Sequence, residues 1–178
     1  TGGPVTVRGI DPSYLHMAIM KLRAMGCCVD AGDDWITCSR NQPLQPTDIQ
    51  TLPHPGFPTD LQAQFMLLCS LAHGTSMVTE NVFENRFMFA SELARMGADI
   101  TIEDHHALVR GVNDLQGTDV SSTDLRAGAA LVLAGIVAEG ETRVHNIKHI
   151  DRGYEDYCGK LSQLGASVSR RQVGAAGE

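Results

Sequence analysis

The sequence has no excess of basic residues. Its 178 residues include 14 Lys and Arg against 21 Asp and Glu, which gives a formal net charge of −7 at pH 7. Surfaces that bind nucleic acid or an anionic membrane need positive charge to neutralise phosphates. The charge balance therefore argues against both kinds of partner. A small anionic ligand remains compatible with it, because a few arginines can still converge on one point.

Paired cysteine motifs are also missing. The cysteines are odd in number and include no CxxC pair; they are Cys27, Cys28, Cys38, Cys69 and Cys158. A disulfide framework or a zinc site is therefore not expected, and reduced thiols in a cytoplasmic protein are the simplest interpretation. HNIKH at 145–149 lacks the glutamate of the HExxH motif, so we expect no metal there. The sequence has no P-loop and no GxGxxG.

No hydrophobic run is long enough to cross a membrane. The longest one, residues 127–138, falls short of the roughly 20 apolar residues that a membrane-spanning helix needs. It has the length of a core helix and carries no charged or polar side chain. A helix without a polar face must be buried.

What the sequence does contain is an internal repeat. KLRAMGCCVD at 21–30, ELARMGADIT at 92–101 and KLSQLGASVS at 160–169 match one another. Each is typical of the end of an amphipathic helix, then a glycine suited to the position after a helix, then a strand. GPVTVRG, GTSMVTEN and GETRVHNI lie upstream of the three stretches, and each predicts a strand after a glycine turn.

A second pair of matches completes the repeating unit. PTDIQT at 46–51 and GTDVSS at 117–122 both lead into a helix that opens with Thr-Asp-Leu. The unit is then strand, helix, strand, helix and a closing strand pair such as residues 99–111. Its first helix is apolar nearly all round, whereas its second is amphipathic. Buried helices surrounded by sheets predict an α/β fold that is an inside-out barrel.

The units are expected at about residues 1–45, 46–116 and 117–170, with a tail at 171–178. The first unit lacks its leading strand and buried helix, and the third ends after its first closing strand. We therefore expect a domain, residues 1–170, that is incomplete at its N-terminus. A missing central helix would uncover apolar sides of its two siblings, at roughly 1.5–3 kcal/mol for each large side chain. The chain should then need upstream sequence or a partner to fold well.

Asp60, at the start of one buried helix, has two possible roles. An aspartate at this position commonly caps a helix by accepting hydrogen bonds from first-turn N–H groups. However, LPHPGFP at 52–58 precedes Asp60 and has no counterpart before Asp124. Three prolines and a glycine indicate a stiff, shaped loop. Such a loop could hold the Asp60 carboxylate where it acts as a general base toward a hydroxyl.

Arginines are predicted in the first turns of three helices. Arg86 and Arg152 align as first-turn residues of the second helix in their units, and Arg126 lies in the first turn of a buried helix. Structural ion pairs are the usual fate of such residues. Because the helix dipole disfavours cations at this end, an anion held jointly by N–H groups and guanidinium groups explains them better. Phosphate or carboxylate would fit.

Four motifs in this order carry a family resemblance: FPTDLQAQ, TENVFENRF, TDLRAGAALVLAG and HIDRGYE. From about residue 2 to 170, the chain resembles the C-terminal part of the UDP-N-acetylglucosamine 1-carboxyvinyltransferases, which are enolpyruvyl transferases of peptidoglycan synthesis. The resemblance implies domains of βαβαββ units with helices inside. It also implies transfer of enolpyruvyl from phosphoenolpyruvate to the sugar 3′-hydroxyl, without a metal or organic cofactor.

The resemblance also implies roles for individual residues. Asp60 matches the base for the sugar hydroxyl, and Asp124 matches a residue close to the reacting carbons. Val82 and Phe83 match the sugar-nucleotide contact. Arg86, Arg126 and Arg152 match arginines near the carboxylate and phosphate of phosphoenolpyruvate.

The chain departs from the family in one respect. The family's reactive cysteine and further basic residues lie in its other domain, and none of the five cysteines here stands in a matching motif. Cys69 and Cys158 are expected to be core or near-core thiols on helices. The chain should therefore be inactive without the missing half of the enzyme. Two alternatives stay open: the sibling enzyme that acts on shikimate 3-phosphate, and a non-catalytic anion-binding module of the same fold.

Overall fold

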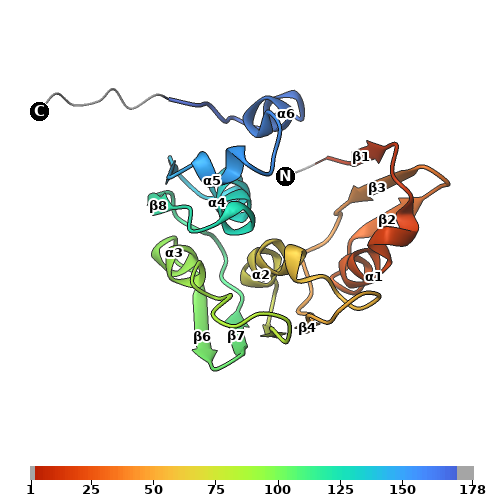
Figure 1. Ribbon diagram of the computed structural model, residues 1–178, viewed down its shortest axis with the longest axis horizontal. Helices are drawn as coiled ribbons and strands as arrows, with labels where there is room; N and C mark the ends of the chain where they lie inside the picture. Colours follow the sequence, from red (N-terminus) through yellow and green to blue (C-terminus); the bar gives the residue numbers. More distant parts are fainter. Residues whose placement is uncertain (1–2, 172–178) are drawn as a thin grey trace, which may run out of the picture.

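A computed structural model describes residues 3–171 as three small sheets arranged around buried helices (Figure 1). Of the tail predicted at 171–178, all but the first residue lies outside the described part. In chain order the elements are β1 (Val5–Arg8), the 3-10 turn η1 (Pro12–Leu15), α1 (His16–Ala24), β2 (Cys28–Ala31), β3 (Trp35–Ser39), β4 (Ile49–Gln50), the 3-10 turn η2 (Thr59–Leu61), α2 (Gln62–Ser70), β5 (Thr75–Thr79), α3 (Ala90–Arg95), β6 (Asp99–Glu103), β7 (His106–Arg110), β8 (Asp119–Ser121), α4 (Leu125–Val137), β9 (Arg143–His145), α5 (Lys148–Asp151) and α6 (Tyr157–Gln163).

The sheets confirm the repeating unit. The second unit holds all of its elements, in the sheet order β4-β5-β7-β6 with β4 and β5 parallel. The first sheet, β1-β3-β2, repeats the β5-β7-β6 part with the same antiparallel pairing. The third, β8-β9, repeats the parallel pair that flanks the buried helix. The strands predicted in GPVTVRG, GTSMVTEN and GETRVHNI are β1, β5 and β9.

The glycine predicted after each amphipathic helix is confirmed in all three units. Gly26, Gly97 and Gly165 adopt φ angles of 88°, 96° and 90°, which only glycine takes without steric cost. In the first unit, the N–H of Cys27 donates across the helix end to the carbonyl of Leu22 at 3.0 Å. The same bond recurs in the other two units. This pattern satisfies carbonyls that the helix leaves unpaired.

The third unit differs from the prediction in two ways. Residues 166–171 form no strand, although a closing strand was expected there. In the second unit, β6 pairs only with β7, and the third unit has no counterpart of β7 among residues 3–171, so its closing segment has no edge to join. Its second helix is also divided, because α5 ends before Gly153 and Asp156, with φ of 45°, precedes α6.

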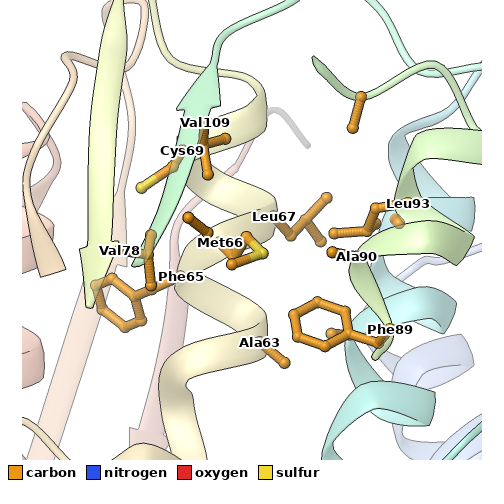
Figure 2. Close-up of a cluster of buried hydrophobic side chains, with 14 of the residues drawn as sticks. Ala63, Phe65, Met66, Leu67, Cys69, Val78, Phe89, Ala90, Leu93 and Val109 are labelled. Atoms are coloured by element: carbon orange, nitrogen blue, oxygen red, sulfur yellow. The ribbon is translucent and has the colours of Figure 1, made fainter. Parts of the chain in front are cut away.

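Helix α2 lies at the centre of the core (Figure 2). Phe65 and Cys69 face the strands that carry Val78 and Val109, and Met66 lies beside Leu67. On the opposite side of α2, the core is completed by Ala63, Leu67, Phe89, Ala90 and Leu93. Burial of each large apolar side chain stabilises the fold by roughly 1.5–3 kcal/mol.

The two central helices are covered to different extents. The expectation that both would show uncovered apolar sides is wrong for α2, because none of its residues is exposed. Strands β5 and β7 and helix α4 pack against α2, and α3 lies on the side of Leu67. On α4, Val132, Leu133 and Ile136 stay half-buried and Val137 is exposed. Among residues 3–171, no helix has both the length and the apolar character of a membrane span.

Candidate functional site

The loop ahead of α2 holds Asp60 away from the capping position. Phe57 is fully buried, and its carbonyl accepts from the N–H of Leu52 at 3.0 Å, which closes the loop at residues 52–57. Pro58 then leads into η2, where Asp60 makes no capping hydrogen bond. The side chain of Asp60 is 62% exposed. The carboxylate is therefore available for contacts across the site.

Asp124 does cap its helix, although its sequence context matches that of Asp60. Its Oδ1 accepts from the backbone N–H groups of Arg126 and Ala127 at 2.8 and 3.1 Å. These bonds satisfy two donors at the start of α4. The cap also fixes the backbone of Arg126, so that its side chain leaves the first turn of α4 toward α2.

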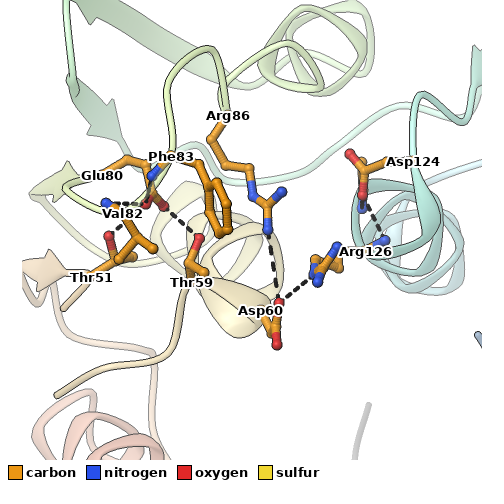
Figure 3. A network of polar contacts seen from close by, with 10 residues as sticks. Thr51, Thr59, Asp60, Glu80, Val82, Phe83, Arg86, Asp124 and Arg126 are labelled. Atoms are coloured by element: carbon orange, nitrogen blue, oxygen red, sulfur yellow. Dashed lines mark hydrogen bonds and ion pairs between the residues drawn. The ribbon is translucent and has the colours of Figure 1, made fainter. Parts of the chain in front are cut away.

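Two guanidinium groups converge on Asp60 (Figure 3). Arg126 donates from Nε to Asp60 Oδ1 at 2.5 Å, and Arg86 Nη2 lies 3.8 Å from the same oxygen. The side chains of Arg86 and Arg126 are 20% and 31% exposed. Within residues 3–171, Asp60 Oδ2 makes no hydrogen bond or ion pair. The cluster thus combines one free carboxylate oxygen with two cations.

Arg86 does not lie in a helical first turn, contrary to the prediction. It belongs to the turns that precede α3, just after Asn85, which has a φ angle of 55°. Its guanidinium stacks over the ring of Phe83, 4.7 Å from the centroid. This stacking and burial, rather than a helix N-terminus, orient Arg86.

A narrow cleft lies between these side chains. Its free volume is about 10 Å³, which is room for about one water-sized group. The lining residues come from η2, α2, the turns before α3, and α4; they are Thr59, Gln62, Ala63, Arg86, Phe89, Asp124, Arg126 and Ala127. The two buried helices thus meet the arginines at one place.

Glu80, which the sequence analysis did not single out, ties the loops of the site together. It follows β5, is 3% exposed, and accepts hydrogen bonds at 2.8 Å from the hydroxyls of Thr51 and Thr59. Its Oε1 also accepts from the backbone N–H groups of Val82 and Phe83 at 2.8 and 3.1 Å. One buried carboxylate therefore holds both the segment of Asp60 and the 82–83 turn (Figure 3). Glu80 stands inside the motif TENVF, but only the fold reveals these four partners.

Val82 and Phe83 present different surfaces. Val82 is half-buried, whereas Phe83 is exposed apart from its contact with Arg86. An exposed aromatic ring beside a guanidinium group offers a flat apolar face next to positive charge.

Arg152 is the predicted site residue that the structure does not join to the cluster. It follows α5 as its C-cap and is exposed, so it is not a first-turn residue. It makes no hydrogen bond or ion pair within residues 3–171. The neighbouring Tyr154 does approach the site: burial raises the pKa of its hydroxyl, and the charges of Arg126 and Asp60 act on that pKa in opposite directions.

The cysteines stay apart from this cluster. Cys69 is buried on α2, and burial raises the pKa of its thiol to about 11. A protonated thiol is a poor nucleophile at neutral pH. Cys158 is half-buried on α6, so both thiols have the core or near-core positions that were expected.

Comparison with known proteins finds relatives that carry the same name. UDP-N-acetylglucosamine 1-carboxyvinyltransferase from Aeromonas salmonicida is 53% identical over 96% of this chain and 41% of its own length. The protein of the same name from Psychrobacter sp. is 49% identical over 96% of this chain and 39% of its own length. The chain therefore spans about two fifths of the length of these relatives.

Solved structures share the fold. The enolpyruvyl transferase NikO from Streptomyces tendae superposes with a TM-score of 0.83 at 34% identity, over 92% of this chain and 39% of NikO. EPSP synthase from Acinetobacter baumannii reaches a TM-score of 0.71 at 20% identity, over 95% of this chain and 43% of its own. At that identity, the second likeness concerns the fold alone.

The family model of EPSP synthase (3-phosphoshikimate 1-carboxyvinyltransferase) matches residues 1–161. Together with the inside-out arrangement of βαβαββ units, this match shows that the chain belongs to the EPSP synthase family of enolpyruvyl transferases.

Proposed function

We propose that this chain is the C-terminal part of an enzyme that transfers enolpyruvyl from phosphoenolpyruvate to the 3′-hydroxyl of UDP-N-acetylglucosamine. The observation that carries the proposal is the contact of Asp60 with Arg86 and Arg126 beside one cleft. A carboxylate with a free oxygen suits a base, and paired guanidinium groups suit an anionic substrate. The names of the relatives support this acceptor.

The proposed reaction is an addition followed by an elimination. Asp60 takes the proton of the 3′-hydroxyl while the sugar oxygen bonds to C2 of phosphoenolpyruvate and C3 gains a proton. The C2–O bond to phosphate then breaks as C3 loses a proton, which leaves the enolpyruvyl ether and inorganic phosphate. Arg86, Arg126 and Arg152 would stabilise the charge on the carboxylate and the departing phosphate. Asp124 would lie close to the reacting carbons.

Recognition of the acceptor falls to Val82 and Phe83 in this proposal. Val82 and Phe83 follow β5, and their backbone N–H groups donate to the Glu80 carboxylate. The same carboxylate accepts from Thr59, next to Asp60. A sugar nucleotide lying on this turn would bring its hydroxyl toward Asp60.

The proposal includes a partner, a compartment and no cofactor. The N-terminal half of the enzyme would supply the reactive cysteine, because the thiols here lie outside the cluster. The five cysteines are free, which suits the reducing cytoplasm, where we place this step of peptidoglycan synthesis. The chemistry requires no metal or organic cofactor.

An acceptor assay tests the proposal. The complete protein should release phosphate from phosphoenolpyruvate with UDP-N-acetylglucosamine and not with shikimate 3-phosphate. The second acceptor is the alternative favoured by the description of the matching family. Activity with shikimate 3-phosphate alone would show that the protein is the sibling enzyme. No phosphate release with either acceptor would favour a non-catalytic anion-binding module.

A further inference from the structure

One buried polar side chain at the cleft has no partner. Gln62, the first residue of α2, is 1% exposed. Its Nε2 makes no hydrogen bond within residues 3–171. Buried polar groups in folded proteins are nearly always hydrogen-bonded, and one without a bond lowers stability. Packing therefore gives no reason for an amide at this position.

The neighbours of Gln62 supply a functional reason. Gln62 lines the same cleft as Arg86, Asp124 and Arg126. Nη2 of Arg86 is a second buried nitrogen without a hydrogen bond, since its closest carboxylate oxygen, on Asp60, is 3.8 Å away. Two unsatisfied donors, one neutral and one cationic, thus border one small cleft with a further guanidinium beside them. Donors in such a setting call for an oxygen acceptor that carries negative charge.

We infer that Gln62 is a further substrate-binding residue, whose side-chain amide donates to an oxygen of the anionic substrate held between Arg86 and Arg126. The inference rests on the proposed function. The oxygen that accepts this hydrogen bond belongs to the carboxylate or the phosphate of phosphoenolpyruvate, since both groups offer negatively charged oxygens. A neutral donor adds direction to the site without adding a third positive charge, so product phosphate can still leave.

The test replaces Gln62 by Met in the complete protein. Met has a similar size and no donor, so it removes the unsatisfied group without opening a large cavity. Gln64→Met is the matched control, because Gln64 lies on the same helix, also has a buried amide atom without a hydrogen bond, its Oε1, and does not line the cleft. Melting temperatures are measured with and without inorganic phosphate, and KM is measured for phosphoenolpyruvate and for the acceptor.

Gln62→Met should melt at the same temperature as the parent protein or higher, because an unsatisfied buried amide is gone. It should lose most of the stabilisation by phosphate, and its KM for phosphoenolpyruvate should rise about tenfold, as expected when one hydrogen bond to a charged group is lost. The KM for the acceptor should not change. If pyruvate also stabilises the parent protein and not the variant, the Gln62 amide binds the carboxylate of phosphoenolpyruvate. If phosphate has this effect and pyruvate does not, the amide binds the phosphate group.

Two results would overturn the inference. A melting temperature of Gln62→Met well below that of Gln64→Met would show that the amide is bonded within the fold. An unchanged KM with unchanged phosphate stabilisation would show that no ligand uses it. The phosphate melts do not depend on turnover, so they judge Gln62 even if the acceptor assay rejects the proposed function.

Discussion

Asp60 and Asp124 show how one local sequence can serve two purposes. Both follow a threonine and precede a leucine at the opening of a buried helix. One carboxylate oxygen of Asp124 accepts hydrogen bonds from N–H groups of α4, whereas Asp60 lies in a 3-10 turn and contacts arginines from two other segments. The extra loop at residues 52–58 makes the difference, because it delivers the chain to α2 through η2.

Replacing Asp60 by Asn tests its role as a base. In the complete protein, turnover should fall by about 10²–10⁴-fold, the usual contribution of a general base. The fold and sugar-nucleotide binding should persist, since the side chain is exposed. Turnover is measured by phosphate release and binding by calorimetry. Near-normal turnover would remove Asp60 from the mechanism.

Arg152 calls for a different test, because its side chain makes no hydrogen bond or ion pair within the described residues 3–171. Arg152→Lys should raise the KM for phosphoenolpyruvate, since an ammonium cannot grip two oxygens at once. Arg110→Lys, in the β6–β7 hairpin where Arg110 pairs with Asp99, provides a control that should leave this KM unchanged. A KM for phosphoenolpyruvate that is unchanged in both variants would show that Arg152 does not bind this substrate.

The Glu80 network predicts an imbalance between stability and turnover. Thr59→Val removes one hydrogen bond to Glu80 next to Asp60. Thr51→Val removes a bond to the same carboxylate and also the acceptor of the Asn81 N–H. Thr51→Val should therefore destabilise the fold more, with about 1 kcal/mol for each lost bond.

If Glu80 positions Asp60, Thr59→Val should nevertheless lower turnover more, by about tenfold. Thermal melts and steady-state assays of both variants give the comparison. Turnover losses that simply follow the losses of stability would reduce Glu80 to a structural role.

At the scale of elements, α4 depends on close approach to its neighbours. A Cβ on Gly128 would lie 2.3 Å from Ser122 Oγ and 2.7 Å from Ile150 Cγ1. The glycine thus lets Ser122, which follows β8, and Ile150 of α5 approach the turn of α4 that follows Asp124 and Arg126. Packing here positions half of the candidate site.

Gly128→Ala should accordingly destabilise the protein. Ala favours a helix by up to about 1 kcal/mol over Gly, but overpacking a tight core typically costs about 1–3 kcal/mol. Gly3→Ala, where nothing lies within 4 Å of an added Cβ, should be neutral. Denaturation midpoints decide between packing and helix propensity: a gain in stability for Gly128→Ala would show that helix propensity outweighs the clash.

At the scale of the whole molecule, α4 is the central helix whose apolar side stays partly uncovered. Val137 is exposed, and Val132, Leu133 and Ile136 are only half-buried on a helix whose residues 127–137 are all apolar or glycine. The chain spans about two fifths of the length of its relatives, 39% for the Psychrobacter protein and 41% for the Aeromonas salmonicida protein. Under the proposed function, the N-terminal half of the enzyme would cover this apolar surface.

The polypeptide of residues 1–178 alone should therefore be less stable than the complete protein and inactive. Calorimetry and sedimentation measure its melting and its association, and mixing it with the remaining half should restore phosphate release. A cooperative melt of the isolated polypeptide as a monomer, at the temperature of the complete protein, would contradict the expectation.

Local signals allowed the sequence alone to predict the units. The glycines after helices, the strand patterns and the apolar helix at 127–138 depend on neighbouring residues and on backbone preferences, so they can be read along the chain. The same is true of the four family motifs. These features yielded the order of elements, the buried helices and the set of candidate residues.

Only the tertiary structure decided how those residues meet. Asp60, Arg86 and Arg126 lie on three separate segments. The packing of α2 against α4 brings Asp60 and Arg126 together, and the turns before α3 add Arg86. The burial of Glu80 and the unsatisfied amide of Gln62 likewise depend on what surrounds them in space. The missing closing strand has the same cause, because a strand needs a partner edge. Contacts between distant segments are set by packing, and no local pattern encodes them.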